Sequence, residues 1–143
     1  MLDLEVAKKC LSDRGLTLCI VKGGKIIFES GLHGVSGFLE AVDQCDGKLS
    51  GASVADRIIG KAIALLCLHV NVNTVYACVL SEKARKLFER NKVHVEWSSL
   101  VENILDAKGE GTCPFEHLVS GISDPSEAYV RLKALHCSLK RNK

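Results

Sequence analysis

The spacing of apolar residues divides the first third of the chain into a helix, a hairpin and a second helix. Residues 3–13 carry apolar side chains at helical spacing, which predicts a short amphipathic helix. Residues 16–22 and 25–30 form two β-rich runs around a Gly-Gly pair, so they predict a hairpin with a two-residue turn. A glycine-rich loop follows, and residues 38–45 predict a short helix.

Residues 53–69 form a long apolar segment, and their pattern predicts one helix. Because the segment is apolar nearly all round, such a helix needs cover on more than one side, as in an element between a sheet and another layer. Gly60 lies in its middle and costs about 1 kcal/mol of helix propensity relative to alanine. We therefore expect a close backbone approach at Gly60.

The second half of the chain alternates between strand and helix patterns. Residues 74–80 predict an apolar strand, residues 81–91 an amphipathic helix and residues 92–97 a further strand, an order typical of a parallel crossover. Helical segments are then expected at residues 99–107, at residues 113–121 and from Asp124 onward. The whole order predicts a single α/β domain over residues 1–143, a three-layer α-β-α sandwich with a mixed sheet.

Charge and composition argue against several classes of protein. The net charge is +2, and the scattered lysines and arginines lack the basic stripe of a nucleic-acid-binding protein. No segment has the run of about 18 apolar residues that a membrane span needs, and the N-terminus lacks the apolar run of a signal peptide. We therefore expect a cytoplasmic protein that binds neither membranes nor nucleic acid.

Seven cysteines lie along the chain, and no two of them form a C-x-x-C pair. Their odd number and irregular spacing do not fit a disulfide framework or a zinc ribbon. Cys19, Cys67 and Cys78 fall in apolar runs, where a free thiol behaves as a small buried hydrophobe. Cys113 differs, because it precedes a proline at a predicted helix start.

Four motifs follow one another along the chain: "GASVADRIIGKA", "VYACVLSEKA", "GTCPFE" and "DPSEAY". Together they resemble a family catalogued as a domain of unknown function, number 1893, within the cytidine-deaminase-like fold. The resemblance implies a hairpin followed by a helix, strand, helix, strand unit, with the functional site where the two crossover helices begin. It spans nearly the whole chain and implies no established activity.

The true zinc deaminases of this fold carry H-A-E at the start of the first crossover helix and P-C-x-x-C at the start of the second, because zinc needs three protein ligands and a water. The matching stretches here read "VAD" and "LSEKA". Val54 stands at the position of the zinc-binding His and Ala84 at that of one zinc-binding Cys, and neither can bind a metal. Of the motif positions, only those of the proton-transferring Glu and of the other Cys keep polar residues, Asp56 and Ser81. We therefore expect no metal site, no cofactor and no classical zinc-dependent deamination. Two helix N-termini that converge on one pocket would still favour a small polar or nucleotide-like ligand.

Asp56 has two interpretations that can coexist. With Ser53 it fits a capping box at the start of the predicted helix, which alone would explain a carboxylate there. Alternatively, Asp56 faces a ligand or transfers protons. Arg57 and Lys61 stand four residues apart on one face of the same predicted helix. They form either an exposed or interface edge, or a clamp for a phosphate or carboxylate.

Ser81 precedes an amphipathic helix and is most simply its N-cap. Glu82 then lies in the first turn, where negative charge is favoured in any case. Both residues also belong to the predicted ligand set, because they stand at the start of the second crossover helix. His33 lies in the glycine-rich loop and fits either an exposed or a pocket-lining position.

Cys113, or the residue before it, would cap a helix that has Pro114 at its first position, and Glu116 stands where a capping-box carboxylate belongs. A thiol at a helix N-terminus is more reactive than an ordinary thiol, and His117 lies one turn further on. Cys113 and His117 therefore fit a structural role, a nucleophile and base pair, or two metal ligands that lack a third.

These candidates support three hypotheses. The first is binding of a small polar or nucleotide-like ligand where the two crossover helices begin, with Asp56, Ser81 and Cys113 lining the pocket. The second is an enzyme of unassigned class with Asp56 as general base and Cys113 as nucleophile. The third is a non-catalytic homo-oligomer with a large apolar interface. The other residues of the predicted ligand set are Ser53, Arg57, Lys61, Glu82 and Glu116.

Overall fold

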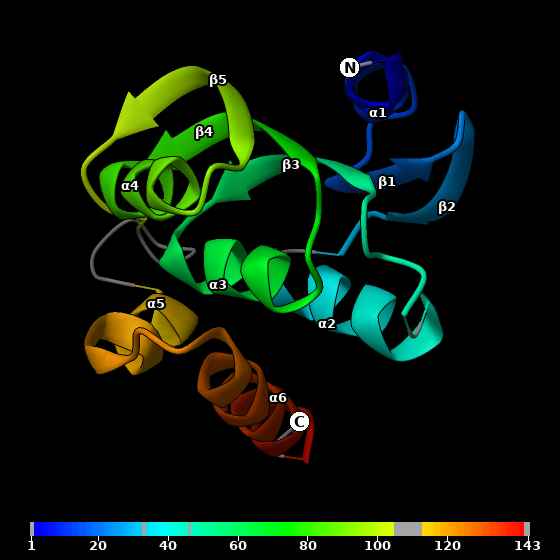
Figure 1. Ribbon diagram of the computed structural model, residues 1–143. Helices are drawn as coiled ribbons and strands as arrows, with labels where there is room; N and C mark the ends of the chain where they lie inside the picture. Colours follow the sequence, from blue (N-terminus) through cyan, green and yellow to red (C-terminus); the bar gives the residue numbers. More distant parts are fainter. Residues whose placement is uncertain (1, 33, 46, 105–112, 142–143) are drawn as a thin grey trace.

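A mixed five-stranded sheet with strand order β2-β1-β3-β4-β5 forms the centre of the molecule (Figure 1). The computed structural model describes residues 2–32, 34–45, 47–104 and 113–141. The strands are β1 (Leu18–Lys22), β2 (Lys25–Ser30), β3 (Ser53–Ile59), β4 (Thr74–Ser81) and β5 (His94–Val101). β1 pairs antiparallel with β2 and β3, whereas β3, β4 and β5 are parallel neighbours. The predicted mixed sheet is therefore confirmed.

Helices cover both faces of this sheet (Figure 1). They are α1 (Leu2–Asp13), α2 (Gly34–Cys45), α3 (Lys61–His69), α4 (Glu82–Arg90), α5 (Pro114–Leu118) and α6 (Pro125–Arg141). Alternate residues of β1 point to opposite faces of the sheet. Leu18 and Ile20 join the main core with α2, α3 and α4, whereas Cys19 and Val21 pack against α1 on the other face. The three-layer α-β-α arrangement is as predicted. The order of hairpin, helix, strand, helix and strand is the one that the deaminase-like resemblance implied.

The C-terminal helices add an outer layer against α3. α6 buries Ala128 and Leu132 in the main core, and Tyr129 stacks on His69 at the end of α3 with ring centroids 4.7 Å apart. α5 lies beneath the start of α3 (Figure 1). With the sheet on one side and α6 on the other, α3 is buried all round, which explains why its sequence has no polar face.

Residues 53–59 form strand β3, so the prediction of one helix over 53–69 is wrong for its first half. β3 is the central strand of the sheet, and both of its faces are covered. Five of its seven residues are buried, so its sequence lacks the alternation of apolar and polar residues that marks a half-exposed strand. Gly60, in extended backbone at φ −107° and ψ −168°, ends the strand and is the N-cap of α3. The close approach expected at Gly60 is confirmed below.

The predicted helix at 99–107 is wrong over its described part, because residues 99–101 belong to β5 and residues 102–104 are not helical. Residues 105–107 lie outside the described part of the chain. The hairpin, α4 and the final helix beginning at Pro125 agree with their predictions. Within the described ranges, no helix is both long and apolar enough to cross a membrane.

Candidate functional site

A pocket of about 120 Å³ lies where the parallel strands β3 and β4 end and α3 and α4 begin. This is the edge of an α/β sheet at which ligands commonly bind. Its more enclosed side chains belong to Lys61, Ser81, Ile104 and Glu116, and its exposed rim is formed by Lys83, Glu102, Asn103, His117 and Ser120. The expected convergence of two helix starts on one pocket is therefore present, and it includes three of the predicted residues, Lys61, Ser81 and Glu116.

Glu116 binds the start of α3. Its Oε1 accepts a hydrogen bond from the backbone N–H of Lys61 at 2.9 Å, and its Oε2 accepts one from Ala62 at 2.7 Å. Gly60 makes this contact possible, because a Cβ atom there would collide with the Glu116 carboxylate and lie 2.8 Å from Cγ1 of Ile104. Glu116 is thus a cap, as predicted, but of a helix 55 residues earlier in the chain rather than of its own.

Two lysines bring positive charge to the pocket. Lys61 is half-buried as a residue, and its exposed ammonium donates to the backbone carbonyl of Ser120 at 3.3 Å. Burial lowers the pKa of Lys61, and the positive charge of Lys83 lowers it further, while the Glu116 carboxylate acts in the opposite direction. Lys61 and Lys83 therefore lie close enough to repel each other, and an anion between them would relieve that repulsion.

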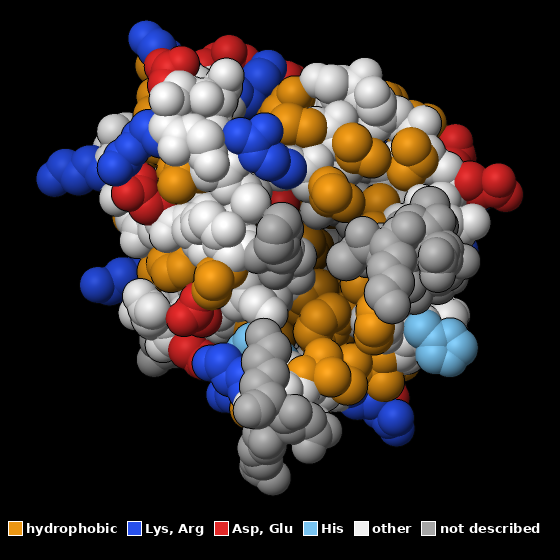
Figure 2. Space-filling model, turned by 180° about the vertical axis from the view of Figure 1, so that it is seen from behind, with side chains coloured by type: hydrophobic (Ala, Val, Ile, Leu, Met, Phe, Trp, Pro, Cys, Tyr) orange, Lys and Arg blue, Asp and Glu red, His pale blue; other side chains and the backbone are white. Residues whose placement is uncertain are grey.

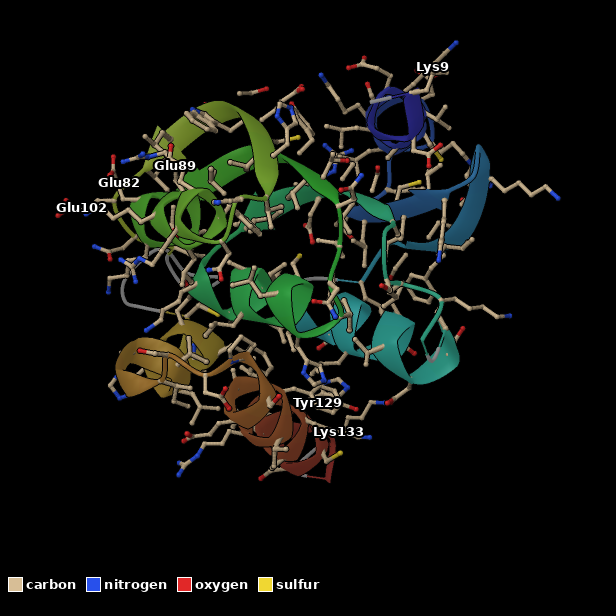
Figure 3. All side chains as sticks on the ribbon, in the orientation of Figure 1. Lys9, Glu82, Glu89, Glu102, Tyr129 and Lys133 are labelled. Carbon is tan, nitrogen blue, oxygen red and sulfur yellow. The ribbon has the colours of Figure 1, made fainter. Side chains whose placement is uncertain are left out.

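Ser81 and Glu82 have different surroundings although they are neighbours. Ser81 is 1% exposed and is the N-cap of α4, since its Oγ accepts from the Ala84 N–H at 3.1 Å. This confirms the predicted cap. Glu82 lies in the first turn, pairs with Arg85 at 3.3 Å and projects outward, as Figure 3 shows. Glu82 does not line the pocket, so its predicted ligand contact is not supported by its position.

Cys113 is the N-cap of α5, with Pro114 at the first helical position, as predicted. Its side chain makes no capping hydrogen bond, and its carbonyl accepts from the backbone N–H of His117 at 2.9 Å. Cys113 is half-buried next to the pocket but does not line it, whereas His117 is exposed on the rim. Of this predicted pair, the structure places only the imidazole at the pocket.

Asp56 lies on β3, so the capping box that pairs it with Ser53 is wrong. Asp56 is 4% exposed, and Oδ1 accepts a hydrogen bond from the backbone N–H of Ile58 at 3.2 Å. Burial raises the pKa of this carboxyl to about 8, although backbone N–H groups of Ile58 and Arg57 act in the opposite direction. Ser53 instead accepts a hydrogen bond from the hydroxyl of Thr74 on β4 at 2.6 Å. Neither Ser53 nor Asp56 lines the pocket.

Arg57 and Lys61 do not share a helix face, so the predicted clamp is also wrong. The Arg57 guanidinium donates to the carbonyl of Leu16 at 2.6 Å and to that of Leu11, in the last turn of α1, at 3.5 Å. It lines a separate depression of about 500 Å³ between α1 and the sheet, together with Tyr76 and Cys78. Arg57 therefore connects β3 to the end of α1 through hydrogen bonds, whereas Lys61 lines the pocket at the starts of α3 and α4.

The residues present do not fit a zinc ion. The "VAD" stretch lies on β3 and not at the start of a helix, and the residues that do stand at the start of α3, Gly60, Lys61 and Ala62, include no His, Cys, Asp or Glu. At the second helix the two cysteine positions hold Ser81 and Ala84. In the part of the chain that the structure describes, no group of three or more His, Cys, Asp or Glu side chains could hold a metal.

The sequence interpretation missed several pocket residues. Lys83 stands only two residues after the Ser81 cap, so a search of the first helical turn for cations would have found it. Glu102, Asn103 and Ser120 come from segments that follow β5 and α5, and no spacing in the sequence indicates that these segments reach α3. His33 lies outside the described residues. The cysteines inside apolar runs are buried at Cys19 and Cys67, and half-buried at Cys78.

Comparison with known proteins identifies relatives over most of the chain. The crystal structure of a DUF1893 family protein (TM1506) from Thermotoga maritima is 29% identical, covers 93% of this chain and 89% of its own, and superposes with a TM-score of 0.85. Acinetobacter baumannii RibD, form 2, is 19% identical over 68% of this chain and 33% of its own, with a TM-score of 0.43.

A further structure is the diaminohydroxyphosphoribosylaminopyrimidine deaminase/5-amino-6-(5-phosphoribosylamino)uracil reductase from Thermotoga maritima. It is 18% identical over 82% of this chain and 40% of its own, with a TM-score of 0.47. This chain thus spans less than half the length of either RibD-type protein. A search of the curated proteins found no match. The family model TM1506, a domain of unknown function (DUF1893), matches residues 6–135, and the chain therefore belongs to the DUF1893 family.

Proposed function

We propose that the pocket at the starts of α3 and α4 binds the anionic group of a small polar ligand. The observation that carries this proposal is the pair of lysines, Lys61 and Lys83, that lie close together at the pocket beside the buried Ser81 hydroxyl. The Glu116 charge is already engaged by two backbone N–H groups, and Glu102 projects outward (Figure 3). Although the Glu116 carboxylate also acts on Lys61, the two lysines line the pocket and would attract a phosphate or a carboxylate.

The volume of the pocket limits the size of the bound group. About 120 Å³ holds a phosphate or a short carboxylic acid, whereas sites for larger ligands usually measure about 300–1,000 Å³. A nucleotide-like ligand would place a phosphate in the pocket and leave its sugar and base outside. The supported ligand class is therefore a small anion, or a larger molecule held by its anionic end.

Replacing Lys83 with glutamine tests this proposal. Loss of one charge-assisted hydrogen bond should weaken binding of inorganic phosphate about tenfold, measured by isothermal titration calorimetry at low salt. Lys86→Gln is the matched control, since Lys86 is exposed on the same helix but does not line the pocket. Equal affinity in all three proteins would show that phosphate does not bind between Lys61 and Lys83.

An enzyme that uses Asp56 and Cys113 stays a prediction that the geometry does not favour. Asp56 is buried within the sheet, and Cys113 stands beside the pocket rather than in it. If Cys113 is nevertheless a nucleophile, iodoacetamide should alkylate it at neutral pH much faster than the similarly half-buried Cys137.

We also propose that the chain associates with a second copy through the edge strand β5. Trp97 and Leu100 are each 38% exposed there, and the strand contains no lysine or proline that would block pairing. Figure 2 shows hydrophobic side chains gathered in patches on the face opposite to Figure 1. Sedimentation velocity should show a dimer that Trp97→Lys dissociates and Ile26→Lys, on the other edge strand, does not. A monomeric wild-type protein would contradict this proposal.

A further inference from the structure

The start of α3 holds a carboxylate from another helix at the place where a helix start binds an anion. The backbone N–H groups of Lys61 and Ala62 donate to Glu116 at 2.9 and 2.7 Å, one to each carboxylate oxygen. α3 is nine residues long, and its N-cap, Gly60, has no side chain with which to accept from these groups. An external carboxylate or phosphate would use the same two donors. Glu116 therefore fills an anion subsite with a charge that belongs to the chain itself.

Gly60 provides the space for this subsite. A Cβ atom there would collide with Oε1 of Glu116 and lie 2.5 Å from its Cδ. The backbone at Gly60 has φ −107°, which other residues adopt without strain, so the carboxylate rather than the backbone conformation requires a glycine. An oxygen of any other anion in this position would meet the same Cβ. Alanine at this position would therefore close the subsite whether or not Glu116 is present.

The groups around the subsite also fit an external anion. Glu116 lines the same pocket of about 120 Å³ as Lys61, Lys83 and Ser81. Ser81 is 1% exposed, and its Oγ accepts from the Ala84 N–H, while its hydroxyl proton has no acceptor in the described part of the chain. The hydrogen bonds of Glu116 go to backbone N–H groups and use neither ammonium group nor this hydroxyl. An anion larger than the Glu116 carboxylate could engage all of these donors together.

We propose that Glu116 is an internal competitor of the ligand, and that its carboxylate leaves the start of α3 when a small carboxylate or phosphate binds there beside Lys61 and Lys83. The inference rests on the proposed anion site and adds the regulation of that site. While Glu116 caps α3, the two N–H donors are closed to other anions. The apparent affinity for the ligand is therefore reduced in proportion to the fraction of molecules in which the carboxylate has moved away.

Glu116→Ala tests the inference by emptying the subsite. The substitution frees two N–H donors and removes one negative charge, so the variant should bind inorganic phosphate at least about tenfold more tightly than the wild-type protein in isothermal titration calorimetry. Glu102→Ala is the matched control, because Glu102 is an exposed carboxylate at the rim of the same pocket. Its removal should raise the affinity only about two- to threefold, which is the effect of a surface charge.

Two further variants distinguish occupation of the subsite from a general loosening of the fold. The double variant Gly60→Ala/Glu116→Ala places a Cβ where the carboxylate was, so it should lose the gain in phosphate affinity. Glu116→Gln keeps the size of the side chain without its charge, so it should show an intermediate gain and replaces Glu116→Ala if that variant does not fold. Acetate should raise the unfolding temperature of Glu116→Ala but not that of the double variant.

The outcomes separate this inference from the anion site on which it rests. If phosphate binds the wild-type protein and Glu116→Ala binds it no more tightly than Glu102→Ala does, Glu116 is a structural cap alone and the anion site stands. If Glu116→Ala binds phosphate and the wild-type protein does not, the competition stands and the proposed binding by the wild-type pocket fails. If neither protein binds phosphate, both proposals fail.

Discussion

Asp56→Asn is expected to remove a large pH dependence of stability and to leave the variant more stable than the wild-type protein at pH 8. The Asp56 carboxyl has a pKa of about 8 in the folded protein because it is buried, whereas an exposed aspartate has a pKa near 4. The folded state therefore binds this proton more tightly than the unfolded state does. Its contribution to stability is complete below about pH 4 and is lost as the pH rises toward 8.

The size of the effect follows from the difference between the two pKa values. Each pH unit between them costs about 1.4 kcal/mol, so the wild-type protein should lose up to about 4 kcal/mol from this group between pH 4 and 7. Asparagine keeps the acceptor for the Ile58 N–H and does not ionise. The difference in unfolding free energy between variant and wild type should therefore grow steadily from pH 5 to pH 8.

Urea unfolding at a series of pH values measures this difference. Asp43→Asn serves as the control, because Asp43 is exposed and pairs with Lys133 at 3.2 Å on the surface. That variant should show no comparable trend. A difference for Asp56→Asn that stays constant from pH 5 to pH 8 would mean that the carboxyl titrates as an ordinary exposed group.

Gly60→Ala is expected to destabilise the protein by about 1–3 kcal/mol, through loss of the Glu116 cap. The backbone at Gly60 has φ −107°, which alanine adopts without strain, so the cost comes from the collision of the new Cβ with the Glu116 carboxylate and Ile104. The carboxylate must then leave the N–H groups of Lys61 and Ala62. α3 would lose its cap and its link to α5.

A mutant cycle distinguishes this mechanism from general crowding. Gly60→Ala should cost much less in a Glu116→Ala background than in the wild-type protein, because the cap is already absent there. Gly121→Ala is the matched control, since a Cβ at Gly121 meets no atom within 4 Å. Full additivity of the two substitutions in urea unfolding would show that Gly60 and Glu116 do not act together.

Local patterns were sufficient for most of the fold because most elements have one exposed face. α4 has a clear apolar stripe and a serine cap, and the hairpin has its Gly-Gly turn, so both agree with their predictions. β3 was misassigned because burial on both faces removes the alternation of a strand. That one error moved Ser53, Asp56 and Arg57 onto a helix start where none of them lies.

The site depends on contacts between distant segments, which explains why only part of it was predicted. Gly60 was correctly identified as a close approach, but the partner that approaches it, Glu116, lies on a different element. Glu116 was correctly expected to cap a helix, and the structure shows that the helix is α3. A capping carboxylate has the same sequence signature whether it serves its own helix or another, so only the tertiary structure decides between them.

An amide NMR titration with inorganic phosphate would show directly whether the starts of α3 and α4 form an anion site. Saturable shifts should concentrate at Lys61, Ser81, Lys83 and His117, the residues that surround the pocket. Shifts that do not saturate, or that concentrate at the hairpin lysines Lys22 and Lys25 instead, would contradict the claim.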